Sequence, residues 1–290
     1  MNRLLPSMVK KRPEVIFWLL CAFILASIAL IPLIDVYNIF DIRDRWYSDR
    51  AMSFYWFYWF LTPVEDPLQW LTLAAAIYVF FANWRLTHQL EALRPSRFWR
   101  LLGVGVILML LEDIYDMRHH SRDFLTEALD SESYGYFGTF FELGYFAVLG
   151  AIMVFAVARY RKEFWDYTKA RNYLIAGYSF YGLAAFSSWA GSSFQSVLDG
   201  DDLYTAIGRR VTGFLFGRDP ESQALFDETN EPLIENARNT LEFFFMDSVY
   251  EESVELLGAA ALLVAGLAFY CECRRRYTDE VGTADDDAPG

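Results

Sequence analysis

The feature that most constrains this chain is a series of long apolar segments separated by short charged loops. A helix needs about 20 apolar residues to cross a bilayer. Hydrophobic residues make up 54% of the chain, and their grouping into such segments is typical of membrane spans rather than of one soluble core. We therefore expect an all-α, polytopic integral membrane bundle with six transmembrane helices, at about 13–34, 67–84, 101–120, 136–158, 172–191 and 252–272.

The distribution of charge predicts the orientation of these spans. Six spans place both termini on one side, together with the loops at 85–100 and 159–171, and every one of these segments is basic. Because basic loops stay in the cytoplasm, both termini are predicted to be cytoplasmic. The expected location is the plasma or inner membrane of a prokaryote. Acidic residues collect on the opposite side, so the external face should concentrate cations.

The remaining segments complete a single transmembrane domain over residues 1–276. Consecutive aromatic residues in the insert at 51–62 are expected at the outer membrane interface, and a stacking platform for a ring-bearing ligand is the alternative. The external loop at 192–239 is acidic and contains one amphipathic patch at about 203–216. The final helix is expected to start near Thr240, and the acidic tail at 277–290 is predicted to be disordered.

The third span carries acidic residues into the membrane. Its apolar part is too short to cross alone, so a helix over 101–120 must include Glu112, Asp113 and Asp116. Counting from Arg100, Glu112 lies roughly 18 Å along the helix, a little past the middle of a ~30 Å hydrocarbon core. Since a charge at that depth costs on the order of 3 kcal/mol, these acids should face other helices.

Acidic residues of other spans fall at a similar depth. Asp116, Glu142 and Glu255 belong to three different helices and are expected in one outer layer, with Glu112 below them and Glu252 above. The spacing predicts that Glu112, Asp116 and either His119 or His120 share one helix face. The alternative interpretation is that these acids mark the points where each span meets water.

Clustered carboxylates of this kind bind a cation or share protons. No basic residue lies within the spans at this depth, and Arg118 and Arg122 are the nearest, at the outer mouth. Carboxylates with one or two imidazoles suit calcium, manganese, iron or zinc. A divalent metal cation is therefore the candidate cofactor, and the predicted ligands are Glu112, Asp113, Asp116, His119, His120, Glu142, Glu252 and Glu255.

Three functions remain open at this stage. The favoured hypothesis is a membrane protein that binds, and conducts or transports, a cation or proton. One alternative is a membrane-embedded metal-dependent enzyme acting on a lipid or other hydrophobic substrate, and another is a non-catalytic subunit or scaffold that holds a membrane-protein partner or a second copy. A net charge of -13 excludes nucleic acid as a partner, and no nucleotide-binding loop or nucleophile elbow is present.

Overall fold

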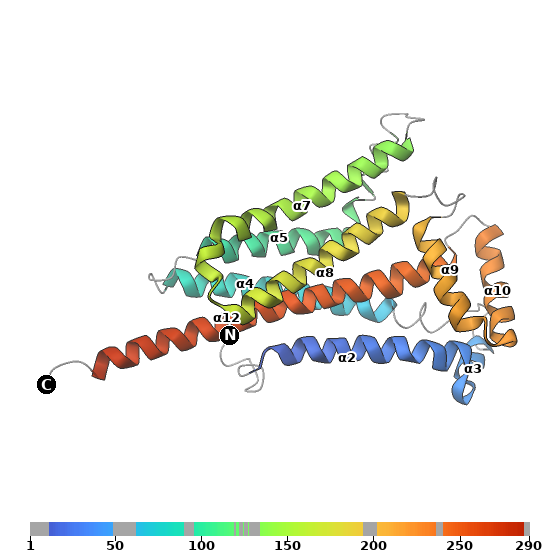
Figure 1. Ribbon diagram of the computed structural model, residues 1–290, viewed down its shortest axis with the longest axis horizontal. Helices are drawn as coiled ribbons and strands as arrows, with labels where there is room; N and C mark the ends of the chain where they lie inside the picture. Colours follow the sequence, from blue (N-terminus) through green and yellow to red (C-terminus); the bar gives the residue numbers. More distant parts are fainter. Residues whose placement is uncertain are drawn as a thin grey trace. The chain divides into compact units, whose positions relative to one another are not determined.

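Helices account for every regular element in the described part of the chain (Figure 1). The computed structural model describes residues 12–48, 62–89, 96–118, 134–193, 202–235 and 240–286, together with 120, 121, 124 and 127. The longer helices are α2 (Glu14–Ile31), α4 (Thr62–Gln89), α5 (Ser96–Tyr115), α7 (Tyr134–Phe164), α8 (Thr168–Ser193), α9 (Leu203–Phe216), α10 (Pro220–Glu235) and α12 (Glu252–Asp286). The all-α prediction is therefore confirmed for these residues. The aromatic insert lies outside them.

Among the described residues, three helical segments are long and apolar enough to cross a membrane. They are Glu14–Val36, Phe140–Arg161 and Leu241–Tyr277, and they coincide with three of the six predicted spans. The other predicted spans fall on α4, α5 and α8, which are helices of 28, 20 and 26 residues. The described part of the chain is thus helical, and some of its helices have the length and apolar composition of membrane spans.

The described residues pack as two compact units, of which the first comprises Met1–Leu19, Gln69–Phe180 and Leu257–Gly290. Within it α5 packs against α7. Gly266 of α12 allows α4 to approach closely, because a Cβ there would lie 2.9 Å from the ring of Phe80. Asn83 donates a hydrogen bond from its buried amide nitrogen to the Gly266 carbonyl oxygen at 2.9 Å.

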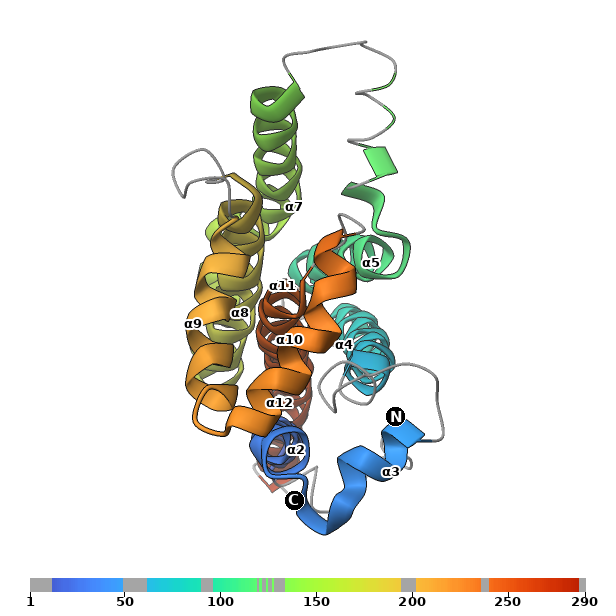
Figure 2. The ribbon, with the colours of Figure 1, turned by 90° about the vertical axis from the view of Figure 1, so that its right-hand side faces the viewer.

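The second unit comprises Leu20–Leu68 and Tyr181–Leu256, and it contains α9 and α10 (Figure 2). α9 coincides with the predicted amphipathic patch, and its N-cap residue is Asp202, whose side chain accepts a hydrogen bond from the Thr205 backbone N–H. The core of the unit is formed by Ile31, Val36, Tyr204, Phe216, Phe226, Leu241, Phe245, Met246 and Val249. α10 was not predicted, because its polar sequence lacks a strong apolar period.

Polar contacts attach the end of α2 to this core. Arg43 of α3 (Ile42–Ser48) is buried and donates to the Asp35 carbonyl oxygen at 3.0 Å. Ser222 of α10 donates to the Val36 carbonyl oxygen at 2.6 Å. Asp35 and Val36 belong to the π-helical turn Pro32–Val36 (η1), in which backbone carbonyls are left for such side-chain donors.

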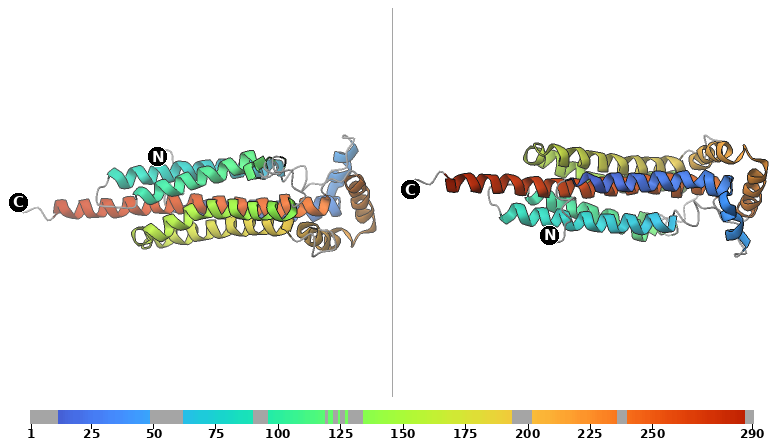
Figure 3. Two further views of the ribbon diagram at one scale, coloured as in Figure 1. Left: turned by 90° about the horizontal axis from the view of Figure 1, so that it is seen from above. Right: turned by 90° about the horizontal axis from the view of Figure 1, so that it is seen from below.

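The last helix starts where it was predicted but ends later. Thr240 caps α11 (Leu241–Phe244) by accepting from the Phe243 N–H, and the chain continues through the π-helical segment Phe245–Glu251 (η4) into α12. α12 then extends to Asp286 (Figure 3). The structure thus draws 277–286 as helix, and the disorder of the tail stays a prediction. Once a helix exists each added residue gains a hydrogen bond, and no proline interrupts the sequence between Glu252 and Pro289.

Candidate functional site

The third predicted span ends earlier than the sequence indicated. α5 stops at Tyr115, and Asp116 adopts a left-handed conformation with φ 45°. The prediction of an unbroken helix to residue 120 is therefore wrong, and Glu112, Asp116 and His120 do not form a continuous stripe. Asp116 and His120 are exposed. His119 lies outside the described residues.

The turn at Asp116 gives Glu112 a basic partner. It brings Arg118 back so that its backbone N–H lies 3.3 and 3.2 Å from the two carboxylate oxygens of Glu112. The Arg118 Nε atom lies 3.8 Å from Glu112 Oε1, and Tyr145 of α7 donates to Glu112 Oε2 at 2.7 Å. The expectation that this acid lacks a cation nearby is wrong, because it assumed a straight helix that would carry Arg118 away.

These contacts predict that Glu112 stabilises the first unit. We expect Glu112→Ala to lower the free energy of unfolding by about 2 kcal/mol, because the buried guanidinium of Arg118 loses its carboxylate. Tyr145→Phe removes one hydrogen bond and should cost about 1 kcal/mol. Thermal unfolding of the purified protein in detergent measures both. Equal stability of Glu112→Ala and the wild type would contradict this role.

Two further predicted ligands of the first unit, Asp113 and Glu142, lie on α5 and α7. Gln69 of α4 donates to Asp113 Oδ2 at 3.0 Å, and Asp113 is half-buried on α5. Glu142 is only 2% exposed and lies three residues before Tyr145 on α7. Since Tyr145 contacts Glu112, this register places Glu142 towards the end of α5, where Asp116 follows.

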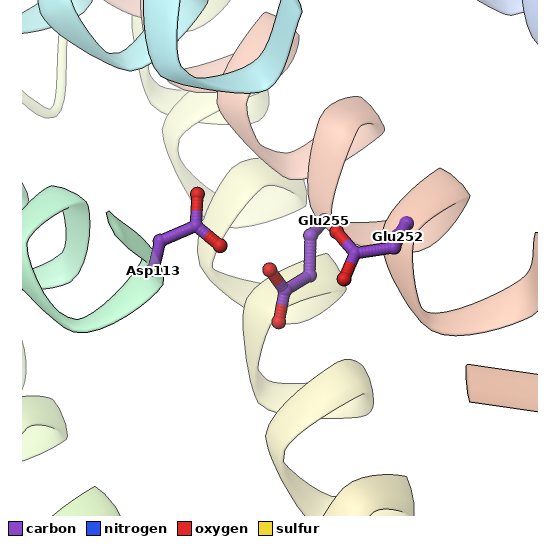
Figure 4. Close-up of side chains that lie close together, drawn as sticks. All are labelled: Asp113, Glu252 and Glu255. Carbon is purple, nitrogen blue, oxygen red and sulfur yellow. The ribbon is translucent and has the colours of Figure 1, made fainter. Parts of the chain in front are cut away.

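The second unit holds a close pair of carboxylates at the start of α12. Oxygen atoms of Glu252 and Glu255 lie within 4.8 Å of each other, and both residues are half-buried; Figure 4 shows both side chains. At that distance two negative charges repel by about 3 kcal/mol with an effective dielectric constant of 20. A cation or a shared proton removes this repulsion.

Glu251, the residue before this pair, accepts a hydrogen bond that the sequence did not reveal. The hydroxyl of Tyr204 on α9 donates to Glu251 Oε2 at 2.5 Å, and the hydroxyl oxygen also lies 3.3 Å from Ser187 Oγ. Burial, followed by the negative charge of Glu251, raises the pKa of Tyr204. The two partners are 47 residues apart, so no local pattern could have paired them.

Glu65, near the start of α4, is a second acidic residue that the sequence prediction missed. It precedes the predicted span at 67–84 and is 0% exposed. Ser253 donates to its Oε1 atom at 3.1 Å, and within the described residues its buried Oε2 atom has no hydrogen-bond partner. Burial raises the pKa of Glu65 to about 8, the Ser253 hydrogen bond opposes this increase, and Asp66 adds to it.

The acidic residues of the two units can therefore be divided by what they contact. Glu112 is engaged by Tyr145 and Arg118, whereas Glu252 and Glu255 form a pair of like charges. Carboxylate oxygens in such a pair suit a hard divalent cation. No protein-family model, curated protein or solved structure matches this chain.

Proposed function

We propose that this protein is a six-span membrane protein that binds a cation at carboxylates on its outer side, and passes this cation or a proton across the membrane. The observation that carries the proposal is the pair formed by Glu252 and Glu255 at the start of α12, within a segment apolar enough to span a membrane. A bound cation or a shared proton would reduce the repulsion between these two charges at short range.

Contacts within the first unit support the proposed topology. Lys169 lies 3.0 Å from the Glu14 carboxylate, at the start of α2, and Arg276 donates to the Asp166 carbonyl oxygen at 3.3 Å. The start of α2, the 159–171 loop and the end of the last span therefore meet. All three were predicted on one side, which the positive-inside tendency assigns to the cytoplasm. We propose the plasma or inner membrane of a prokaryote as the location.

The proposed cation is a hard divalent ion such as calcium or manganese. Glu252 and Glu255 supply carboxylate oxygens, which these ions prefer. Asp113 stays a ligand predicted from the sequence alone. Glu142 likewise stays a prediction from the sequence, whereas Glu112 lies beside Arg118 and is not proposed as a ligand.

The test is a cation titration of the purified protein in detergent by calorimetry. We expect the wild type to bind about one Ca²⁺ or Mn²⁺ per chain, and Glu252→Gln/Glu255→Gln to bind it about 10- to 100-fold more weakly, because two charged ligands are lost.

The matched control is Glu228→Gln/Glu231→Gln, which removes two charges at the same spacing from the exposed surface of α10. Its affinity should equal that of the wild type. Absence of saturable binding to the wild type, or equal weakening by the control pair, would overturn the proposed site. Flux into vesicles then distinguishes transport from binding, and a metal that survives dialysis would favour the enzyme alternative.

A further inference from the structure

A cluster of aromatic rings gathers several helices at one end of the first unit. Phe98 of α5 stacks on Phe164 of α7 with ring centroids 4.4 Å apart. Phe269 of α12 contacts Trp99 at 4.6 Å and Tyr167 at 4.5 Å. Because these contacts join the start of α5, the end of α7, the turn before α8 and the later part of α12, the basic residues that flank these segments are brought together.

Two of these basic residues are held over aromatic rings. The guanidinium of Arg276 lies 4.4 Å from the ring centroid of Tyr167, and that of Arg171 lies 5.0 Å from the ring of Trp165. Arg171 also donates to the Trp165 carbonyl oxygen at 3.2 Å. Arg171 Nε also donates to Asn172 Oδ1 at 3.2 Å, and Arg276 also donates to the Asp166 carbonyl oxygen and to Glu272 Oε1. These contacts orient each guanidinium, and its remaining N–H groups are available to an anion.

The same end of the unit carries an excess of positive charge. Lys169 is paired with Glu14, and Arg276 is paired with Glu272. Many more basic side chains are exposed there, namely Arg85, Arg97, Arg100, Arg159, Arg161, Arg274 and Arg275. Trp165 is 44% exposed beside them. An exposed tryptophan among arginines is typical of the membrane–water interface.

We propose that Trp165, Arg171 and Arg276 form the centre of a surface that binds the phosphate groups of anionic phospholipids. Arginine binds phosphate through two parallel N–H donors, and tryptophan places its ring at the level of the headgroups. The cytoplasmic leaflet is negatively charged and attracts such surfaces. This inference rests on the proposed membrane topology, but it does not depend on the cation site.

The experiment counts lipids bound to the full-length protein by native mass spectrometry, with phosphatidylglycerol and phosphatidylcholine as probes. The wild type should retain phosphatidylglycerol preferentially. Arg171→Gln and Arg276→Gln should each weaken its retention about five-fold, and the double variant about 25-fold. Arg171→Lys keeps the charge and should retain more binding than Arg171→Gln.

Arg218→Gln is the matched control, because Arg218 also lies over a ring, 4.2 Å from that of Phe214, but in the second unit. Its lipid binding should equal that of the wild type. Equal retention of the two lipids, a double variant that behaves as the wild type, or full competition by soluble glycerol phosphate would overturn the inference. Absence of the chain from the membrane fraction would instead overturn the proposed topology.

Discussion

Gly208→Val should destabilise this protein by about 4 kcal/mol or more, the largest loss expected from any single substitution considered for α9. A Cβ atom at Gly208 would lie 2.0 Å from the backbone carbonyl oxygen of Glu242. No rotamer change relieves a clash with backbone, so α9 and α11 must separate and open the core around Leu241. Thermal unfolding in detergent should show the loss as a large decrease in Tm.

Gly213 provides the control on the same helix. A Cβ there would meet nothing within 4 Å, so Gly213→Val should stay within about 0.5 kcal/mol of the wild type. Both substitutions change helix propensity in the same way, so a difference between these two glycines, five residues apart, reports the close contact of α9 with α11. A small effect at both positions would show that α9 does not pack on α11 as described.

Glu65→Gln should make the protein more stable than the wild type at high pH. Folding raises the pKa of Glu65 from its ordinary value of 4.5 to about 8, so the unfolded chain loses this proton first. Stability therefore falls as the pH rises from about 4.5 to about 8, by roughly 5 kcal/mol if the whole shift contributes. Glutamine has a similar shape and no charge, and it removes this pH-dependent loss.

The measurement is Tm as a function of pH for both proteins. The two curves should approach each other near pH 4, where Glu65 is protonated in both states, and should diverge up to pH 9. Ser253→Ala removes the hydrogen bond that favours the carboxylate, so it should raise the pKa of Glu65 further and extend the loss of stability to higher pH. Parallel curves for the wild type and Glu65→Gln would show that Glu65 is not buried as described.

Much of the helical framework could be predicted from the sequence. Apolar runs located α2, α7 and α12, and the spacing of polar and apolar residues located α9. The start of the final helix was recognisable from Thr240, which is a favourable N-cap residue. These features are local, because each depends on residues within a few turns of one helix.

The chemistry of the acidic residues depended on tertiary structure. The turn at Asp116 paired Glu112 with Arg118, although the sequence pattern was that of a continuous helix. Glu65 gained its raised pKa from burial beside Ser253, a residue 188 positions away.

The sequence by itself thus determined the long apolar helices and the segments where acidic residues accumulate, because helical periodicity and hydropathy act over neighbouring residues. The tertiary structure decided which acids are neutralised by a basic partner, which are hydrogen-bonded and which remain close to another negative charge. Desolvation and Coulomb interaction depend on distances between groups that are remote in the chain, and only folding sets those distances.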